Sequence, residues 1–94
     1  MNPELDPILH SKLRLSIMSL LISVESADFN YLLEKTGATK GNLSVQLTNL
    51  QEAGYIEIEK SFRNKYPLTT CTITAQGIEA FENYVEAIKT LLNL

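Results

Sequence analysis

The sequence has little of the residue types that build disulfides, metal sites and membrane spans. Its 94 residues include one cysteine, Cys71, and one histidine, His10, so no disulfide and no structural zinc site can form within one chain. No apolar run approaches the roughly 20 residues that a membrane-spanning helix needs, and the start carries no charged-then-apolar signal segment. We therefore expect a cytoplasmic protein with no membrane partner and no cofactor.

Residue patterns typical of catalysis are also missing. The sequence contains no nucleophile–base pair, no pair of catalytic carboxylates and no glycine-rich phosphate loop. We therefore predict that the protein is not an enzyme. For Cys71 a small core residue is the favoured role, with a redox sensor as the alternative. For His10 we favour a role at a helix entry over pH sensing or ligand binding.

Charge is unevenly distributed along the chain. The net charge of −3 is unusual for a protein that contacts nucleic acid, but residues 35–78 carry five bases and three acids. Residues 60–78 contain three bases, Lys60, Arg63 and Lys65, and no acid. A local basic patch matters more for phosphate contact than the charge of the whole chain. We therefore expect these three side chains to contact phosphates.

Capping residues and apolar periodicity predict four helices. In the third helix, residues 40–53, Leu43, Leu47 and Leu50 recur at helical spacing and are expected to face the core. In the first, the expected buried face is Leu13, Ile17, Leu20, Leu21 and Val24. The helices are expected to begin after Asp6 or Ser11, Asp28 or Asn30, Thr39 and Thr74, and to end near residues 23, 36, 53 and 92.

Two strands are predicted between the third and fourth helices. Apolar and polar residues alternate over residues 56–62, and β-branched residues dominate residues 69–73, with a turn at residues 63–67 between them. The tight turn at residues 37–39 is typical of a helix-turn-helix, and the hairpin forms the wing. The fold class is therefore mainly α with a small β-hairpin: one winged helix-turn-helix domain, residues 1–94, with a three-helix core.

The outward face of the third helix is polar but nearly uncharged. It carries Gly41, Asn42, Val45, Thr48, Asn49 and Glu52. Amides, a hydroxyl and a small apolar group are what base edges and thymine methyl groups accept. An ordinary solvated face is the alternative interpretation of the same pattern.

The ordered motifs resemble those of MarR-like and ArsR-like winged-helix regulators. The similarity is carried by residues 39–47 (TKGNLSVQL), 52–56 (EAGYI), 60–62 (KSF) and 74–77 (TAQG). The resemblance implies sequence-specific binding of double-stranded DNA by a small dimeric transcriptional regulator. The helix at residues 40–53 would enter the major groove, and the wing, residues 60–70, would contact the phosphate backbone. The implied DNA contacts are Thr39, Lys40, Asn42, Ser44, Val45, Gln46 and Asn49, with Arg63 and Lys65 on the wing.

The last helix, residues 75–94, has more apolar surface than one small domain can cover. One apolar stripe suffices to dock the helix on its own domain, and a second stripe needs a partner, because large apolar patches are rarely left exposed. We therefore expect a homodimer through this helix, with packing of both stripes inside one chain as the alternative. The first stripe is Ile78, Phe81, Val85, Ile88 and Leu92. The expected interface is Ala80, Tyr84, Ala87, Leu91 and Leu94, with Leu5, Ile8 and Leu9.

A second class of function stays open. A winged-helix module that contacts other proteins without binding DNA would suit the acidic net charge. The sequence does not identify an effector ligand.

Overall fold

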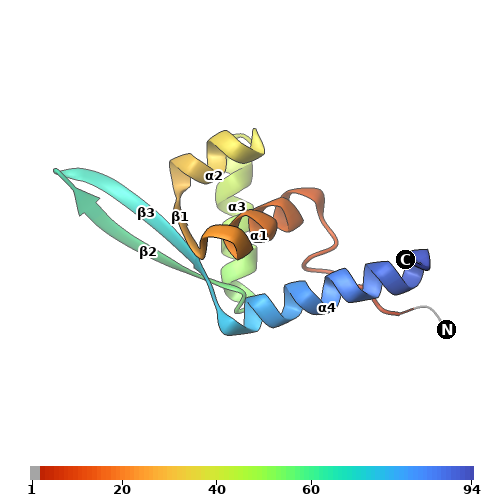
Figure 1. Ribbon diagram of the computed structural model, residues 1–94. Coiled ribbons are helices and arrows are strands. Elements are labelled where there is room, and N and C mark those ends of the chain that lie inside the picture. The colour runs from red at the N-terminus through yellow and green to blue at the C-terminus, as the bar shows by residue number, and fades with distance from the viewer. Residues whose placement is uncertain (1–2) are drawn as a thin grey trace.

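The computed structural model describes residues 3–94, which form four helices and one antiparallel three-stranded sheet (Figure 1). This is the winged helix-turn-helix that the sequence predicts. The elements are α1 (Lys12–Val24), β1 (Ser26–Asp28), α2 (Phe29–Thr36), α3 (Lys40–Glu52), β2 (Ile56–Arg63), β3 (Tyr66–Ile73) and α4 (Ala75–Leu92).

The helices begin at side chains that accept hydrogen bonds from their own first turn. Asp28 accepts from the amide of Tyr31 at 2.8 Å, and Ser11, Thr39 and Thr74 cap α1, α3 and α4 in the same way. Each cap satisfies a backbone N–H that the helix itself leaves without a partner. Of the alternatives left open by the sequence, Ser11 and Asp28 are the caps, whereas Asp6 closes a separate turn before α1.

The core lies between α1, α2, α3 and the sheet. The three leucines of α3 that were expected to face inward are buried, as predicted. The prediction for Val24 was wrong, because this last residue of α1 is 43% exposed. The buried residues are Leu9, Ile17, Met18, Leu21, Leu32, Leu43, Leu47, Leu50, Ile56, Cys71, Ile73 and Tyr84.

The sheet contains a strand that sequence reasoning missed. β1 pairs with β3, giving the order β1-β3-β2, so β3 is the central strand. Ser26 lies opposite Thr72, and their hydroxyl oxygens are 2.9 Å apart. The wing is therefore attached at its base to the segment that leads into α2.

The hairpin is longer and its turn tighter than predicted. β2 reaches Arg63 and β3 begins at Tyr66, so only Asn64 and Lys65 form the turn. Both have positive φ, 51° and 70°, as a two-residue type I′ turn requires. Pro67 is tolerated in β3 because β1 pairs only with residues 70–72, which leaves Pro67 one neighbouring strand.

α4 extends away from the hairpin, and its start packs tightly on the end of the helix-turn-helix (Figure 1). A Cβ on Gly77 would lie 2.1 Å from the carbonyl oxygen of Tyr55, so a side chain at this position has no room. The Tyr55 hydroxyl donates a hydrogen bond to Asp6 Oδ2. Burial, this bond and the Asp6 charge raise the pKa of Tyr55 to about 12.

Two residues expected at a dimer interface lie in the core of the chain instead. Leu9 is fully buried, and Tyr84 is 6% exposed with its hydroxyl 2.9 Å from His10 Nδ1. The expectation that Leu9 and Tyr84 face a second copy is therefore corrected. The N-terminal segment folds back over this part of α4 and covers it.

None of the helices within residues 3–94 combines the length and the apolar character needed to cross a membrane. The same residues hold no group of three or more His, Cys, Asp or Glu side chains that could bind a metal ion. Cys71 is buried in the core, and its burial raises the pKa of the thiol to about 11.

Candidate nucleic-acid interface

The outward face of α3 presents a polar surface whose first three turns carry no acid. The predicted contacts Thr39, Lys40, Asn42, Ser44 and Val45 are all exposed. No acidic residue occurs between residues 35 and 51, and Glu52 stands at the last residue of the helix. A polyanion approaching the first three turns of α3 would therefore meet no opposing charge from the helix itself.

The remaining two predicted contacts on α3 are only half-buried and bonded to their neighbours. Gln46 Nε2 donates to Asn42 Oδ1 at 3.1 Å, and Asn49 Nδ2 donates to Gln46 Oε1 at 3.4 Å. The same Gln46 oxygen accepts from Arg14 Nη1 of α1. The three amides thus form a connected row along the helix rather than three independent side chains.

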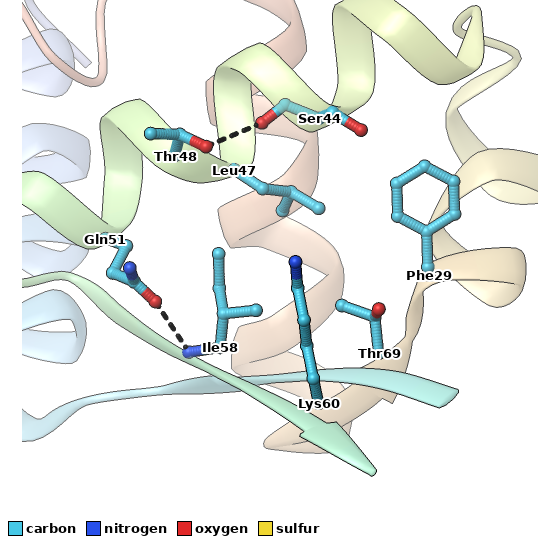
Figure 2. Close-up of a pocket in the computed structure, with 8 residues that line it drawn as sticks. All are labelled: Phe29, Ser44, Leu47, Thr48, Gln51, Ile58, Lys60 and Thr69. Atoms are coloured by element: carbon cyan, nitrogen blue, oxygen red, sulfur yellow. Dashed lines mark hydrogen bonds between the residues drawn. The ribbon is translucent and has the colours of Figure 1, made fainter. Parts of the chain in front are cut away.

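A cleft of about 450 Å³ separates α3 from the wing (Figure 2). It is lined by the apolar side chains of Phe29, Leu47 and Ile58 and by the hydroxyl-bearing side chains of Ser44, Thr48 and Thr69. The Lys60 side chain extends from β2 toward this space, with its ammonium group facing α3 (Figure 2). The Thr48 hydroxyl donates to the backbone carbonyl of Ser44, so the arrangement places one cation with the hydroxyls of Ser44 and Thr69, which suits an anionic oxygen.

A hydrogen bond joins the two walls of the cleft. The backbone amide of Ile58 in β2 donates to Gln51 Oε1 of α3 at 3.0 Å (Figure 2). This bond ties the base of the wing to the second half of the helix. The position of Lys60 relative to the exposed face of α3 therefore follows from the packing of the domain.

The predicted wing cations lie on different faces of the hairpin. Side chains alternate along a strand, so Lys60 shares a face with Ile56 and Ile58, whereas Arg63 shares the opposite face with Glu57 and Glu59. Lys65 lies in the turn. The two acids of β2 therefore point away from the cleft, and they do not oppose the charge of Lys60 on the cleft side of the hairpin.

Sequence reasoning missed one exposed side chain on the Lys60 face. Phe62 lies two residues beyond Lys60 on β2 and is 77% exposed. The alternating pattern places Phe62 on the same face of β2 as Ile56 and Ile58, but it does not show that this residue is exposed whereas Ile56 is buried. The hairpin extends past the helices (Figure 1). An exposed aromatic ring beside a cation is available for contact with a sugar or a base.

Comparisons with known proteins agree with this architecture. A family model described as a winged helix DNA-binding domain matches residues 13–92. An uncharacterized protein from Methanocaldococcus jannaschii is 40% identical over 84 residues, which cover 89% of this chain and 91% of that protein.

Solved structures of regulators share the fold. A transcriptional regulator homologue from Pyrococcus horikoshii aligns with a TM-score of 0.86 at 27% identity, covering 92% of this chain and 85% of that one. The transcriptional regulator BldR from Sulfolobus solfataricus aligns with a TM-score of 0.73 at 20% identity, covering 88% of this chain and 58% of that one, which by itself demonstrates a common fold.

Proposed function

Since this chain belongs to the winged helix DNA-binding domain family, we propose that it is a transcriptional regulator that binds double-stranded DNA sequence-specifically as a homodimer. The family and fold are those of regulators rather than enzymes. In the proposed complex α3 lies in the major groove, and the β2–β3 hairpin lies along the phosphate backbone.

The observation that carries this proposal is the pairing of two surfaces that differ in chemistry. Before Glu52 at its end, the exposed face of α3 offers amides, hydroxyls and Val45 without an acid, which suits base edges and thymine methyl groups. Across the cleft, Lys60 offers the charge that a phosphate needs. Base contacts would give sequence preference, and the phosphate contact would fix the position of the protein on the duplex.

The test is binding to duplexes selected from a random pool, titrated against salt. We expect affinity to fall as salt rises, because each neutralised phosphate releases counterions. Lys60→Ala should flatten the log–log salt slope by about 0.9 if Lys60 neutralises one phosphate. Lys89→Ala removes the same charge from α4, where its partner is the exposed Glu86, and should leave the slope unchanged.

A failed selection would argue for the other class of function. If the wild-type protein recovers no preferred sequence and shows no salt-dependent binding, the DNA-binding proposal is wrong. A protein–protein interaction module, which the acidic net charge favours, would then account better for the same fold.

The homodimer part of the proposal is supported by apolar surface left on α4. Leu91 and Leu94 of the predicted interface are exposed, and Leu94 at 86% is almost wholly so. Leu92, which was expected to dock on its own domain, is exposed as well. Of the rest of the predicted interface, only Leu91 and Leu94 are exposed. The half-buried residues are Leu5, Ile8, Ala80 and Ala87, and the first three of these already pack against the core of the chain. A twofold pair would space two α3 helices by roughly 34 Å, which matches successive major grooves.

Sedimentation at micromolar concentration tests the assembly directly. We expect twice the chain mass of 10.5 kDa for the wild type. Leu91→Glu would place a charge in the proposed interface and should shift the mass to that of the monomer, because burying an unpaired charge is costly. Glu79→Gln, on the exposed start of α4, serves as the matched control and should stay dimeric. A wild-type monomer would contradict this part of the proposal alone.

A further inference from the structure

The guanidinium of Arg14 lies where three parts of the chain meet. Its Nε donates to the carbonyl oxygen of Ile8 in the N-terminal segment, and its Nη1 donates to Gln46 Oε1 on α3. Within residues 3–94 no carboxylate oxygen lies within 4.0 Å of it. The charge of Arg14 is therefore directed at a side-chain amide of the proposed recognition helix instead of an ion-pair partner.

Arginine can donate hydrogen bonds but cannot accept them. The atom of Gln46 that faces Arg14 must therefore be the carbonyl oxygen, which removes the usual ambiguity between the two ends of an amide. With its oxygen held by Arg14, Gln46 turns its Nε2 group toward Asn42. The orientation of one half-buried amide on α3 is thus set by a residue of α1.

The orientation of Gln46 determines those of its two neighbours. Asn42 must present Oδ1 to the Gln46 amide, which leaves the Asn42 Nδ2 group free to donate elsewhere. Asn49 donates Nδ2 to Gln46 Oε1, which leaves Asn49 Oδ1 free to accept. The row therefore offers a donor near the start of α3 and an acceptor two turns later.

We propose that Arg14 is a positioning residue for base recognition, which fixes through Gln46 the donor presented by Asn42 and the acceptor presented by Asn49. This rests on the proposed DNA-binding function. In the major groove a purine N7 or O6 would suit the free donor of Asn42, and the amino group of adenine or cytosine would suit the free acceptor of Asn49. Without Arg14 the side-chain amides can rotate by half a turn, which exchanges their oxygen and nitrogen atoms. Asn42 and Asn49 can then each pair with either a donor or an acceptor on a base edge.

The first experiment uses the free protein. Side-chain amide protons of Gln46 and Asn49 should exchange slowly in the wild type, and faster in Arg14→Met, which keeps a long apolar stem but no donor. Arg14→Lys keeps a donor-only group and should retain part of the protection. Lys12→Ala removes an exposed cation two residues earlier on the same helix and should change nothing.

The second experiment compares DNA selectivity. For Arg14→Met, the ratio of affinities for the selected and a scrambled duplex should fall at least about fivefold, the lower end of what one base-reading pair contributes. The penalty for a 7-deazapurine at the position read by Asn42 should shrink in the same variant. If Arg14→Met does not fold, Arg14→Gln replaces it, because a glutamine amide can donate or accept and does not restore the orientation.

The outcomes separate the two proposals. If the wild type binds one sequence selectively and Arg14→Met is equally selective, or if the Gln46 amide keeps its protection, the role of Arg14 is overturned and DNA binding stands. If Arg14→Met binds all duplexes more weakly by the same factor and has a flatter salt slope, Arg14 contacts a phosphate, and its proposed positioning role is also overturned. A wild type without sequence preference overturns both.

Discussion

At the scale of single residues, the exposed surface of α3 divides into side chains held by neighbours and side chains left free. Gln46 and Asn49 are half-buried and hydrogen-bonded, whereas Ser44 and Val45 project without a side-chain partner among residues 3–94. Side chains that are fixed before binding lose less conformational entropy on contact. We therefore expect the amides to contribute more to discrimination than the hydroxyl.

Substitution of Asn42 and Asn49 is the most direct test of base reading by α3. Asn42→Ala or Asn49→Ala should cost about 1–3 kcal/mol on the selected duplex and little on random DNA, because an amide contact to a base edge is lost. Ser44→Ala is the comparison on the same face. Competition titrations against the selected and a random duplex measure both quantities. Equal losses on the two DNAs would disprove base reading by these amides.

Gly77 is a second single-residue case, here for stability. Gly77→Ala should destabilise the fold by about 1–3 kcal/mol or more, since the added Cβ would collide with backbone that cannot move away. The contact is with the Tyr55 carbonyl oxygen at 2.1 Å. Gly41→Ala, where nothing lies within 4 Å of the added Cβ, is the control and should not destabilise. Urea unfolding of the two variants gives the comparison, and similar midpoints would refute the steric argument.

At the scale of elements, the turn of the wing carries strain that can be relieved. Lys65 has a φ of 70°, a conformation that glycine adopts without the penalty paid by other L-residues. Lys65→Gly should therefore stabilise the fold by about 1 kcal/mol. The same change removes a cation and should weaken DNA binding.

Thermal unfolding and salt titration measure the two effects of Lys65→Gly separately. Lys65→Ala removes the cation without relieving the strain and is the control. If Lys65→Gly and Lys65→Ala have the same melting temperature, the backbone conformation of the turn is not a source of strain.

The elements that sequence predicts well are those with local signals. The starts of α1, α2, α3 and α4 follow from capping residues, and the end of α2 follows from Gly37 with a φ of 69°. β1 has no such signal, because its three residues, Ser26–Asp28, are too few to show the alternation of apolar and polar residues that identifies a strand. They form a strand only because β3 lies beside them, and that pairing depends on the tertiary fold.

Long-range packing also explains why the sequence revealed neither the burial of Tyr84 on α4 nor the hydrogen bond between Arg14 and Gln46. Apolar periodicity finds two stripes on α4 but does not say which one the N-terminal segment covers, and Tyr84 proved to be buried there. The link from Arg14 to Gln46 joins residues 32 positions apart, so no spacing rule could reveal it. The outward face of α3 follows from helical geometry, which is local, and Asn42, Val45 and Thr48 on it are exposed, whereas Asn49 is half-buried by contacts that the spacing does not reveal.

At the scale of the whole molecule, two groups make stability sensitive to alkaline pH. The folded pKa of Cys71 is raised to about 11 and that of Tyr55 to about 12, in both cases mainly by burial. Well below pH 9 both groups are protonated in the folded and unfolded chains. Between about pH 9 and 12 the unfolded chain releases these protons first, so the free energy of unfolding should fall.

Urea unfolding at several values of pH checks this dependence. Cys71→Ala should lower stability overall through lost packing, but it should flatten the fall from pH 9 to 11. Tyr55→Phe should flatten the fall from pH 10 to 12 in the same way. If both variants keep the pH dependence of the wild type, other groups cause the alkaline loss.

The central place of β3 in the sheet also has a consequence for how the chain acquires its structure during synthesis. Ser26 pairs with Thr72, which follows it by 46 residues. Closing a loop of that length costs entropy before any contact repays it. A nascent chain whose β3 residues are still inside the ribosome therefore exposes β1 and β2 but lacks the strand that pairs with both of them. We therefore expect the wing and the segment before α2 to become ordered together, once β3 can pair with both β1 and β2.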